Sequence, residues 1–192
     1  DEQFWVSPGD GDVLLWIEGV AVNSGMDVNV YEPDVSPLQM GGPKSPHVMY
    51  ELFGDLAIDL GYYRAAQTEV NGIPLVLGRT GWSGELSYEL YLQDGSRGNE
   101  LWELVAKAGE KYNIKPAAPQ LIRSIEGELL SYASDISRTD NPYTIDMGRM
   151  VNLEREDDFI GKAALQKIHA EGVKRKLVGI EIAGDPINAP PE

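Results

Sequence analysis

The sequence of 192 residues contains no cysteine, and this absence removes several kinds of chemistry at once. Without a thiol the chain forms no disulfide, thiolate zinc site, cysteine-ligated iron–sulfur cluster or cysteine nucleophile. Histidine is almost as scarce. His47 and His169 are far apart and lack the spacing of metal ligands or of a Ser–His–Asp triad. We therefore expect both histidines at the surface and no metal site, and the lack of cysteine fits a cytoplasmic location.

Basic residues are also in deficit. Lys and Arg number 16 against 31 Asp and Glu, which gives a net charge of −15 and a pI near 4.5. A protein that neutralises nucleic-acid phosphates needs a basic stripe, so we expect no nucleic-acid partner. No apolar run approaches the roughly 18 residues that cross a bilayer, so we expect no membrane partner either.

What the sequence does contain is enough for a packed core. Hydrophobic residues make up 42% of the chain, with four Trp and nine Tyr, and charged residues make up 24%. This composition is unlike that of a disordered chain. The length predicts one or two domains.

Short strand-like runs alternate with helical patterns along the chain. Asn71-Gly72 between two such runs is a strong hairpin signal, and the apolar stripe within 98–111 is typical of a helix. The predicted strands cover 4–7, 27–31, 38–40, 62–70, 73–79, 86–92 and 176–182. The predicted helices cover 13–21 with Asp12 as its cap, 46–53, 98–111, 119–129 and 161–169. Together these elements predict an α+β domain, in which helices lie on one side of a largely antiparallel sheet.

Both ends of the sequence look cut. The chain opens without an initiator Met or a signal segment, and a strand already begins at Phe4. At the other end, the strand-like run 176–182 has few residues after it that could pair with it. We therefore expect this chain to be part of a longer protein, whose remaining polypeptide is one of its partners.

The stretch 78–91 is the most unusual in the sequence. Three glycines, an Arg, Trp82 and two carboxylates lie between two predicted strands. Glycines let a backbone approach a ligand closely. Strand alternation places Glu89 and Tyr91 on the face opposite Leu90, where a carboxylate can accept paired N–H donors of a heterocycle and an aromatic ring can hold it. The alternative is a solvated hairpin with a surface Glu.

A second candidate is the predicted helix 119–129. Arg123 and Glu126 are three residues apart and would be neighbours on a helix. An intrahelical ion pair is one interpretation of this spacing. The other is an arginine directed at a ligand carboxylate.

A series of motifs resembles the T-protein (aminomethyltransferase) superfamily, in the family's order and across nearly the whole chain. Three stretches, 4–7, 32–37 and 129–132, look most like the tetrahydrofolate-dependent demethylase branch, which includes enzymes acting on dimethylsulfoniopropionate and on aryl methyl ethers. The motifs are Phe4-Trp5-Val6-Ser7, 32–43, Arg79-Thr80-Gly81-Trp82-Ser83-Gly84-Glu85, Tyr88-Glu89-Leu90-Tyr91, 126–136, Asn141-Pro142-Tyr143 and 158–165.

The resemblance implies a folate-binding T-protein fold with a ferredoxin-like antiparallel sheet. Residues 1–171 would form the folate-binding domain without its N-terminal portion, and 172–192 would begin a C-terminal β-barrel. Tetrahydrofolate is the implied cofactor, with Glu89 on the amino and N3 edge of the pterin. The other implied cofactor-binding residues are Tyr91, Phe4, Val6, Ser7, Trp82 and Arg123. The family's arginine at a helix start is replaced here by Pro119-Gln120-Leu121, and no catalytic residue is assigned.

The implied activity is transfer of a methyl group from a small donor, a sulfonium or a methyl ether, to N5 of tetrahydrofolate. A sulfonium already carries its leaving group, whereas an ether also needs a general acid, and the sequence offers no obvious one. One alternative is the aminomethyl transfer of the glycine cleavage system, with a lipoyl carrier protein as partner. Another is a non-catalytic folate-binding fragment. The missing cysteine argues against an iron–sulfur assembly factor of the same fold.

Overall fold

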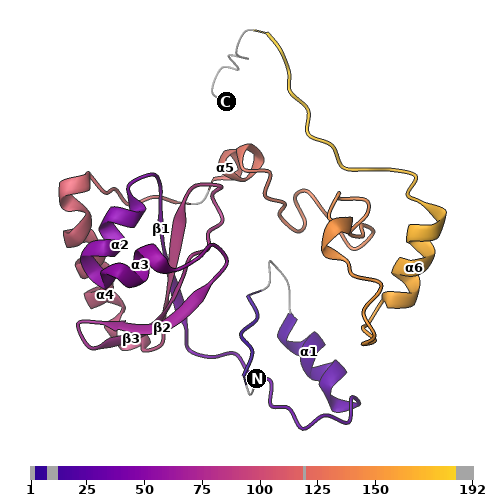
Figure 1. Ribbon diagram of the computed structural model, residues 1–192, viewed down its shortest axis with the longest axis horizontal. Coiled ribbons are helices and arrows are strands. Elements are labelled where there is room, and N and C mark those ends of the chain that lie inside the picture. Colours follow the sequence, from indigo (N-terminus) through magenta and orange to yellow (C-terminus); the bar gives the residue numbers. More distant parts are fainter. Residues whose placement is uncertain (1–2, 8–12, 119, 185–192) are drawn as a thin grey trace, which may run out of the picture. The chain divides into compact units, whose positions relative to one another are not determined.

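The computed structural model describes residues 3–7, 13–118 and 120–184, and the chain divides into two compact units, 1–131 and 132–192. The helices are α1 (Val13–Val22), α2 (Ser45–Phe53), α3 (Asp55–Asp59), α4 (Gly98–Gly109), α5 (Leu121–Glu126) and α6 (Lys162–Glu171) (Figure 1). The strands are β1 (Ser36–Gly41), β2 (Ala65–Val70), β3 (Ile73–Gly78) and β4 (Ser87–Leu92). Short 3₁₀ helices cover Gly95–Arg97, Glu110–Tyr112 and Gly148–Met150.

The first unit is built on a sheet in the order β1-β4-β3-β2, in which every neighbouring pair is antiparallel. β2 and β3 form the predicted hairpin. Asn71 and Gly72 both have positive φ, 50° and 69°, which is the backbone that a tight two-residue hairpin turn requires. β4 lies between β1 and β3, so it is hydrogen-bonded on both sides. The predicted α+β class, with helices on an antiparallel sheet, is confirmed.

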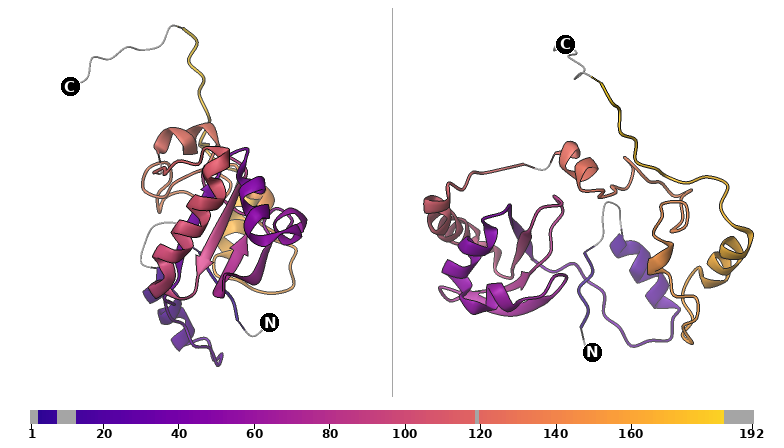
Figure 2. Two further views of the ribbon diagram at one scale, coloured as in Figure 1. Left: turned by 90° about the vertical axis from the view of Figure 1, so that its left-hand side faces the viewer. Right: turned by 45° about the horizontal axis from the view of Figure 1, so that its top comes forward.

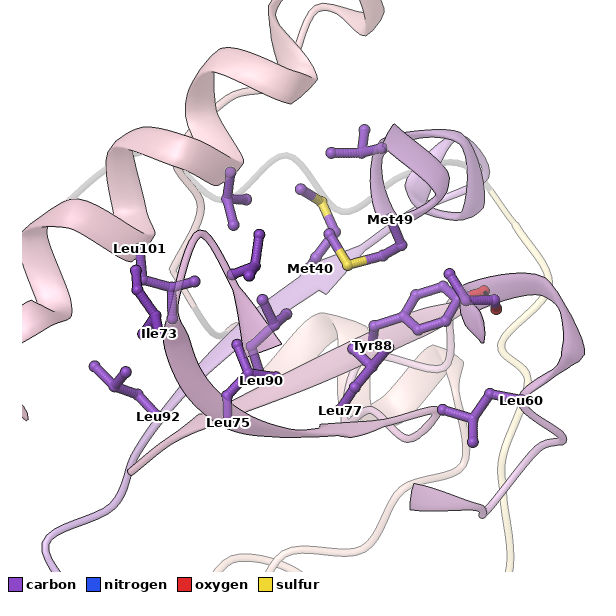
Figure 3. Close-up of a cluster of buried hydrophobic side chains, with 14 residues drawn as sticks. Met40, Met49, Leu60, Ile73, Leu75, Leu77, Tyr88, Leu90, Leu92 and Leu101 are labelled. Carbon is purple, nitrogen blue, oxygen red and sulfur yellow. Dashed lines mark hydrogen bonds between the residues drawn. The ribbon is translucent and has the colours of Figure 1, made fainter. Parts of the chain in front are cut away.

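Alternation along the strands separates a core face from an opposite face. Leu90 of β4 and Leu75 of β3 are fully buried, as are Met49 of α2 and Ala57 of α3. Figure 3 shows Met49 and Leu101 beside the strand side chains of this cluster. The Tyr88 hydroxyl, also in the core, donates a 2.8 Å hydrogen bond to the Ala57 carbonyl. The helices α2, α3 and α4 therefore cover one face of the sheet and leave the other for different contacts.

The helices that cover the sheet follow ordinary sequence rules. α2 begins with Pro46 in its first turn, where a missing N–H costs nothing, and ends at Gly54, whose φ is 58°. α4 buries Leu101 and Val105 on the apolar stripe that the sequence predicts. α3 was not among the predicted elements, because five residues are too few to show a helical period.

A bidentate ion pair ties the β2–β3 hairpin to the start of α4. The Arg97 guanidinium contacts both carboxylate oxygens of Glu100, at 2.8 and 2.7 Å, and also donates to the Gly72 carbonyl at 2.7 Å. Asn71 donates to the same carboxylate at 3.0 Å. These bonds hold the hairpin turn against the helix.

The second unit consists of turns around α6. Asn141 accepts from the backbone N–H groups of Tyr143 and Thr144, so the predicted turn at this motif is present. Arg175 contacts Asp140 at 2.8 Å, and the Leu177 N–H donates to the Thr144 carbonyl at 2.7 Å. The connection after α6 continues to residue 184 without a helix or strand (Figure 2).

Two predicted strands, 4–7 and 27–31, are wrong, and a third, 176–182, stays a prediction together with the barrel start to which it belongs. Residues 4–7, 27–31 and 176–182 show the alternation typical of strands but form none in the structure. A strand exists only as part of a ladder of backbone hydrogen bonds to a second strand, and the described residues supply no such ladder to these segments. The other predictions hold with shifted ends: 62–70 begins at Ala65, and 119–129 shortens to α5. The predicted cap Asp12 lies outside the described residues.

The boundary at residue 171 and the barrel start at 172–192 stay predictions. No helix in the described part of the chain is long and apolar enough to cross a membrane.

Leu90→Ala is expected to destabilise the first unit by about 2–5 kcal/mol, because Leu90 is fully buried in the sheet and its loss leaves a cavity. Urea unfolding followed by circular dichroism measures this change. Ile58→Ala is the control, since Ile58 is 51% exposed on α3, and it should change stability by less than about 0.5 kcal/mol. Equal effects of the two substitutions would contradict the assigned core.

Candidate functional site

Glu89 projects from the middle of β4 on the face opposite the core. Its cross-strand neighbours are Gln39 of β1 and Gly78 of β3. Leu90, the next residue, is fully buried on the other face, which fixes the side to which Glu89 belongs. A half-buried carboxylate on a strand paired on both sides is held by rigid backbone.

Two hydroxyl groups orient this carboxylate. The Thr80 and Tyr91 hydroxyls both donate to Oε2 of Glu89, Tyr91 at 3.0 Å. In the described residues no hydrogen bond reaches Oε1. Glu89 therefore presents one oxygen that is already bonded and one that is available as an acceptor.

Tyr91 connects the carboxylate to the N-terminal segment. Its ring meets Trp5 edge-on, with centroids 6.3 Å apart and planes at 76°. Burial raises the pKa of the Tyr91 phenol, and the adjacent Glu89 carboxylate raises it further, while hydrogen bonding with Thr80 and Ser7 lowers it. The neutral phenol is thus the form that the site stabilises.

Glycine is required where the site is most crowded. A Cβ on Gly81 would lie 2.3 Å from Cβ of Ser87, closer than any side chain tolerates. A Cβ on Gly78 would lie 3.1 Å from Oγ1 of Thr80 and 3.4 Å from the Tyr91 ring. Gly78 therefore leaves room for the Thr80 hydroxyl and the Tyr91 ring beside Glu89, and Gly81 lets the loop pack directly on Ser87.

The loop 79–86 is anchored at both ends. Arg79 exchanges backbone hydrogen bonds with the turn before β2, accepting from the Tyr63 N–H at 3.1 Å and donating to the Arg64 carbonyl at 2.9 Å. Its guanidinium donates to the Leu60 carbonyl at 2.9 Å. At the far end the Leu86 carbonyl accepts from the Ser45 hydroxyl at 2.8 Å. These hydrogen bonds therefore anchor the loop to the rest of the first unit at both of its ends.

α5 meets this loop through backbone and charge. A Cβ on Gly84 would lie 2.9 Å from Cα of Gly127, so the backbone of the loop directly contacts the backbone at the end of α5. Arg123 pairs with Glu85 at 3.2 Å, and both side chains are about half exposed. The predicted pair of Arg123 with Glu126 is not the one formed, because Glu85 lies within reach across the loop.

The structure brings together only some of the predicted cofactor-binding residues. Glu89, Tyr91 and Ser7 lie close together. Phe4 and Val6 are 76% and 66% exposed, and no described contact joins them to Glu89. Trp82 is half-buried in the loop, and Arg123 is directed at Glu85.

Sequence reasoning missed two residues that contact this site. Trp5 packs on Tyr91, and Thr80 donates to Glu89. Alternation along 4–7 could have indicated Trp5, because it shares a side with Ser7 rather than with Phe4 and Val6. Thr80 carried no signal of its own in the glycine-rich loop.

The two histidines lie at the surface, as the sequence predicts. His47 stacks on Tyr112 with ring centroids 5.7 Å apart, and His169 meets Tyr143 edge-on at 5.4 Å. Among the described residues no group of His, Asp and Glu side chains is arranged to hold a metal ion.

The arrangement favours binding of a flat ligand with N–H donors along one edge. Oε1 of Glu89 is an oriented acceptor, and the Tyr91 ring, on which Trp5 packs, supplies aromatic surface next to the carboxylate. The pterin ring of a folate, with an N–H next to an amino group, fits these groups.

Residues 1–155, well over half of the chain, match the family described as the GCVT N-terminal domain. The chain therefore belongs to this family, and the resemblance to the T-protein (aminomethyltransferase) superfamily is confirmed.

Relatives from both branches are similar to this chain. It is 35% identical over 184 residues to the dimethylsulfoniopropionate demethylase of Ruegeria pomeroyi. The aligned region covers 96% of this chain and 50% of that protein. It is 33% identical over 161 residues to an aminomethyltransferase of Alkaliphilus metalliredigens, covering 82% and 43%. An aminomethyltransferase of Clostridium botulinum (strain Langeland) is 31% identical over 190 residues, covering 95% and 50%. The chain thus spans about half the length of these relatives.

Glu89→Gln is expected to lower the pKa of the Tyr91 phenol. In the native protein a Tyr91 phenolate would stand beside a carboxylate, and the substitution removes that like charge. Carbon-13 NMR of labelled tyrosines across an alkaline pH series measures this, with Tyr91→Phe assigning the signal. Glu103→Gln on α4 is the control and should leave the titration unchanged. A Tyr91 titration insensitive to Glu89→Gln would contradict the contact between the two residues.

Proposed function

We propose that the protein containing this chain transfers a one-carbon group to tetrahydrofolate. The observation that carries the proposal is the oriented Glu89 carboxylate with its available Oε1, on a sheet face that also presents Tyr91, against which Trp5 packs. Membership in the GCVT N-terminal domain family supports it. When bound, tetrahydrofolate would supply N5 as the atom that accepts the one-carbon group.

Within this chain, Glu89 is the residue proposed to hold the pterin edge. Its Oε1 accepts from the N–H and amino groups, and Tyr91 and Ser7 lie beside it. We also propose that Phe4, Val6, Trp82 and Arg123 contact the folate in the complete protein, as the family resemblance implies. A bound folate aligned in this way needs no nucleophilic side chain, because positioning of donor and acceptor supplies much of the rate.

The donor we propose is a small sulfonium such as dimethylsulfoniopropionate. The relative that matches 96% of this chain at 35% identity bears the name of a demethylase of that compound. In such a transfer the methyl–sulfur bond breaks with its electron pair going to sulfur, a methyl–nitrogen bond forms, and the N5 proton leaves to solvent. A sulfonium needs no general acid, whereas a methyl ether does.

A second candidate is aminomethyl transfer from a lipoyl carrier protein, as in the glycine cleavage system. Several relatives at 31–33% identity are named aminomethyltransferases. A third is that this chain by itself binds folate without catalysis, since it spans about half the length of these relatives.

Glu89→Gln is expected to weaken tetrahydrofolate binding by about 10- to 100-fold, the effect of losing a hydrogen-bonded charge. Isothermal titration calorimetry of the intact protein under anaerobic conditions measures the affinity. Glu103→Gln, on the helix side of the sheet, should bind as tightly as the unsubstituted protein. Unchanged affinity in Glu89→Gln would exclude Glu89 from the folate site.

The donor is identified by proton NMR of the intact protein with tetrahydrofolate and one donor at a time. With dimethylsulfoniopropionate we expect loss of the sulfonium methyl signal and growth of 5-methyl-tetrahydrofolate and of the demethylated thioether. Vanillate tests the methyl-ether route, and an aminomethyl-lipoyl carrier tests the second candidate through methylene-tetrahydrofolate and ammonia. Turnover of either of these without turnover of the sulfonium would overturn the proposed donor.

A further inference from the structure

We propose that Thr80 is a positioning residue, which locks the Glu89 carboxylate through Oε2 and leaves Oε1 as the single oxygen for ligand recognition. The identity of the ligand rests on the proposed function, whereas the lock itself rests on the contacts of Thr80, Glu89 and Tyr91.

The lone pairs of the carboxylate explain why only Oε1 remains available to a ligand. A carboxylate oxygen offers about two acceptor positions, and Oε2 already accepts from the Thr80 and Tyr91 hydroxyls. Oε1 keeps both of its positions. A ligand edge with an N–H beside an amino group would thus direct both donors at Oε1, instead of one at each oxygen. This differs from a parallel contact in which each carboxylate oxygen accepts one donor.

Thr80 is better placed than Tyr91 to act as the lock. The preceding residue, Arg79, is fixed by two backbone hydrogen bonds and by its guanidinium on the Leu60 carbonyl. On the other side, Gly78 leaves the space that the Thr80 hydroxyl fills. Thr80 therefore holds its position through the backbone of the fold, while the Tyr91 hydroxyl sits at the end of a long side chain.

The lock has a consequence for specificity. A fixed carboxylate cannot swing to suit a different ligand edge, so Thr80 restricts the site to ligands whose donors converge on one point. Removing the Thr80 hydroxyl would free Oε2 and let the Glu89 carboxylate rotate. Binding would then be weakened by the conformational entropy that this side chain loses when a ligand orders it.

The first arm of the test needs no ligand. The pKa change that Glu89→Gln produces at Tyr91 is measured by carbon-13 NMR in the native protein and in Thr80→Val. If Thr80 holds the carboxylate beside Tyr91, the change shrinks clearly in the Thr80→Val background and is restored by Thr80→Ser. Thr68→Val on β2 is the matched control, because it makes the same substitution away from Glu89. An equal change in the native and Thr80→Val proteins would overturn the lock.

The second arm measures tetrahydrofolate affinity of the intact protein by calorimetry. Thr80→Val is expected to weaken binding about tenfold, while Thr80→Ser and Thr68→Val stay within about threefold of native. In the Glu89→Gln background, Thr80→Val should cause little further loss of affinity, since both substitutions act through the carboxylate of Glu89. Additive losses would overturn the positioning role. A native protein that does not bind tetrahydrofolate would overturn the proposed function, and the first arm would still decide the lock.

Discussion

The alternation of side chains along β4 is the constraint on which the rest of the structure depends. Leu90 and its alternate neighbours fill the core under α2 and α4, and Glu89 and Tyr91 stand on the other face. A slip of one residue would exchange the two sets and bury the carboxylate among leucines. Because β1 and β3 pair with β4 on both sides, that slip would break two ladders at once. The stability of the fold and the placement of the candidate site are therefore set by one register.

Elements that are encoded locally could be predicted from the sequence. The Asn71-Gly72 turn, the apolar stripe of α4 and the alternation of β4 each depend on residues within a few positions of one another. The segments 4–7, 27–31 and 176–182 show the same local alternation and yet form no strand. A strand depends on a partner that local sequence does not reveal. The difference lies in the range of the interaction, not in the strength of the pattern.

The candidate site divides in the same way. Glu89 and Tyr91 could be placed together because they are two residues apart on one strand. The contact between Arg123 and Glu85 could not be predicted, since it joins α5 to a loop far away in sequence. Thr80 reaches Glu89 because the chain turns back between β3 and β4. Its role depends on a distance in space that no spacing in the sequence expresses.

The direct contact between Gly84 and Gly127 limits how this part of the molecule can change. A Cβ added to either residue falls within 3.0 Å of Cα of the other. In most crowded sites, a larger side chain on one partner can be compensated by a smaller one on the other. Here neither partner has a side chain to reduce, so a substitution at one position has no compensating substitution at the other. The loop and α5 can diverge in sequence around this point, but the two glycines themselves can be altered only by separating the segments they join.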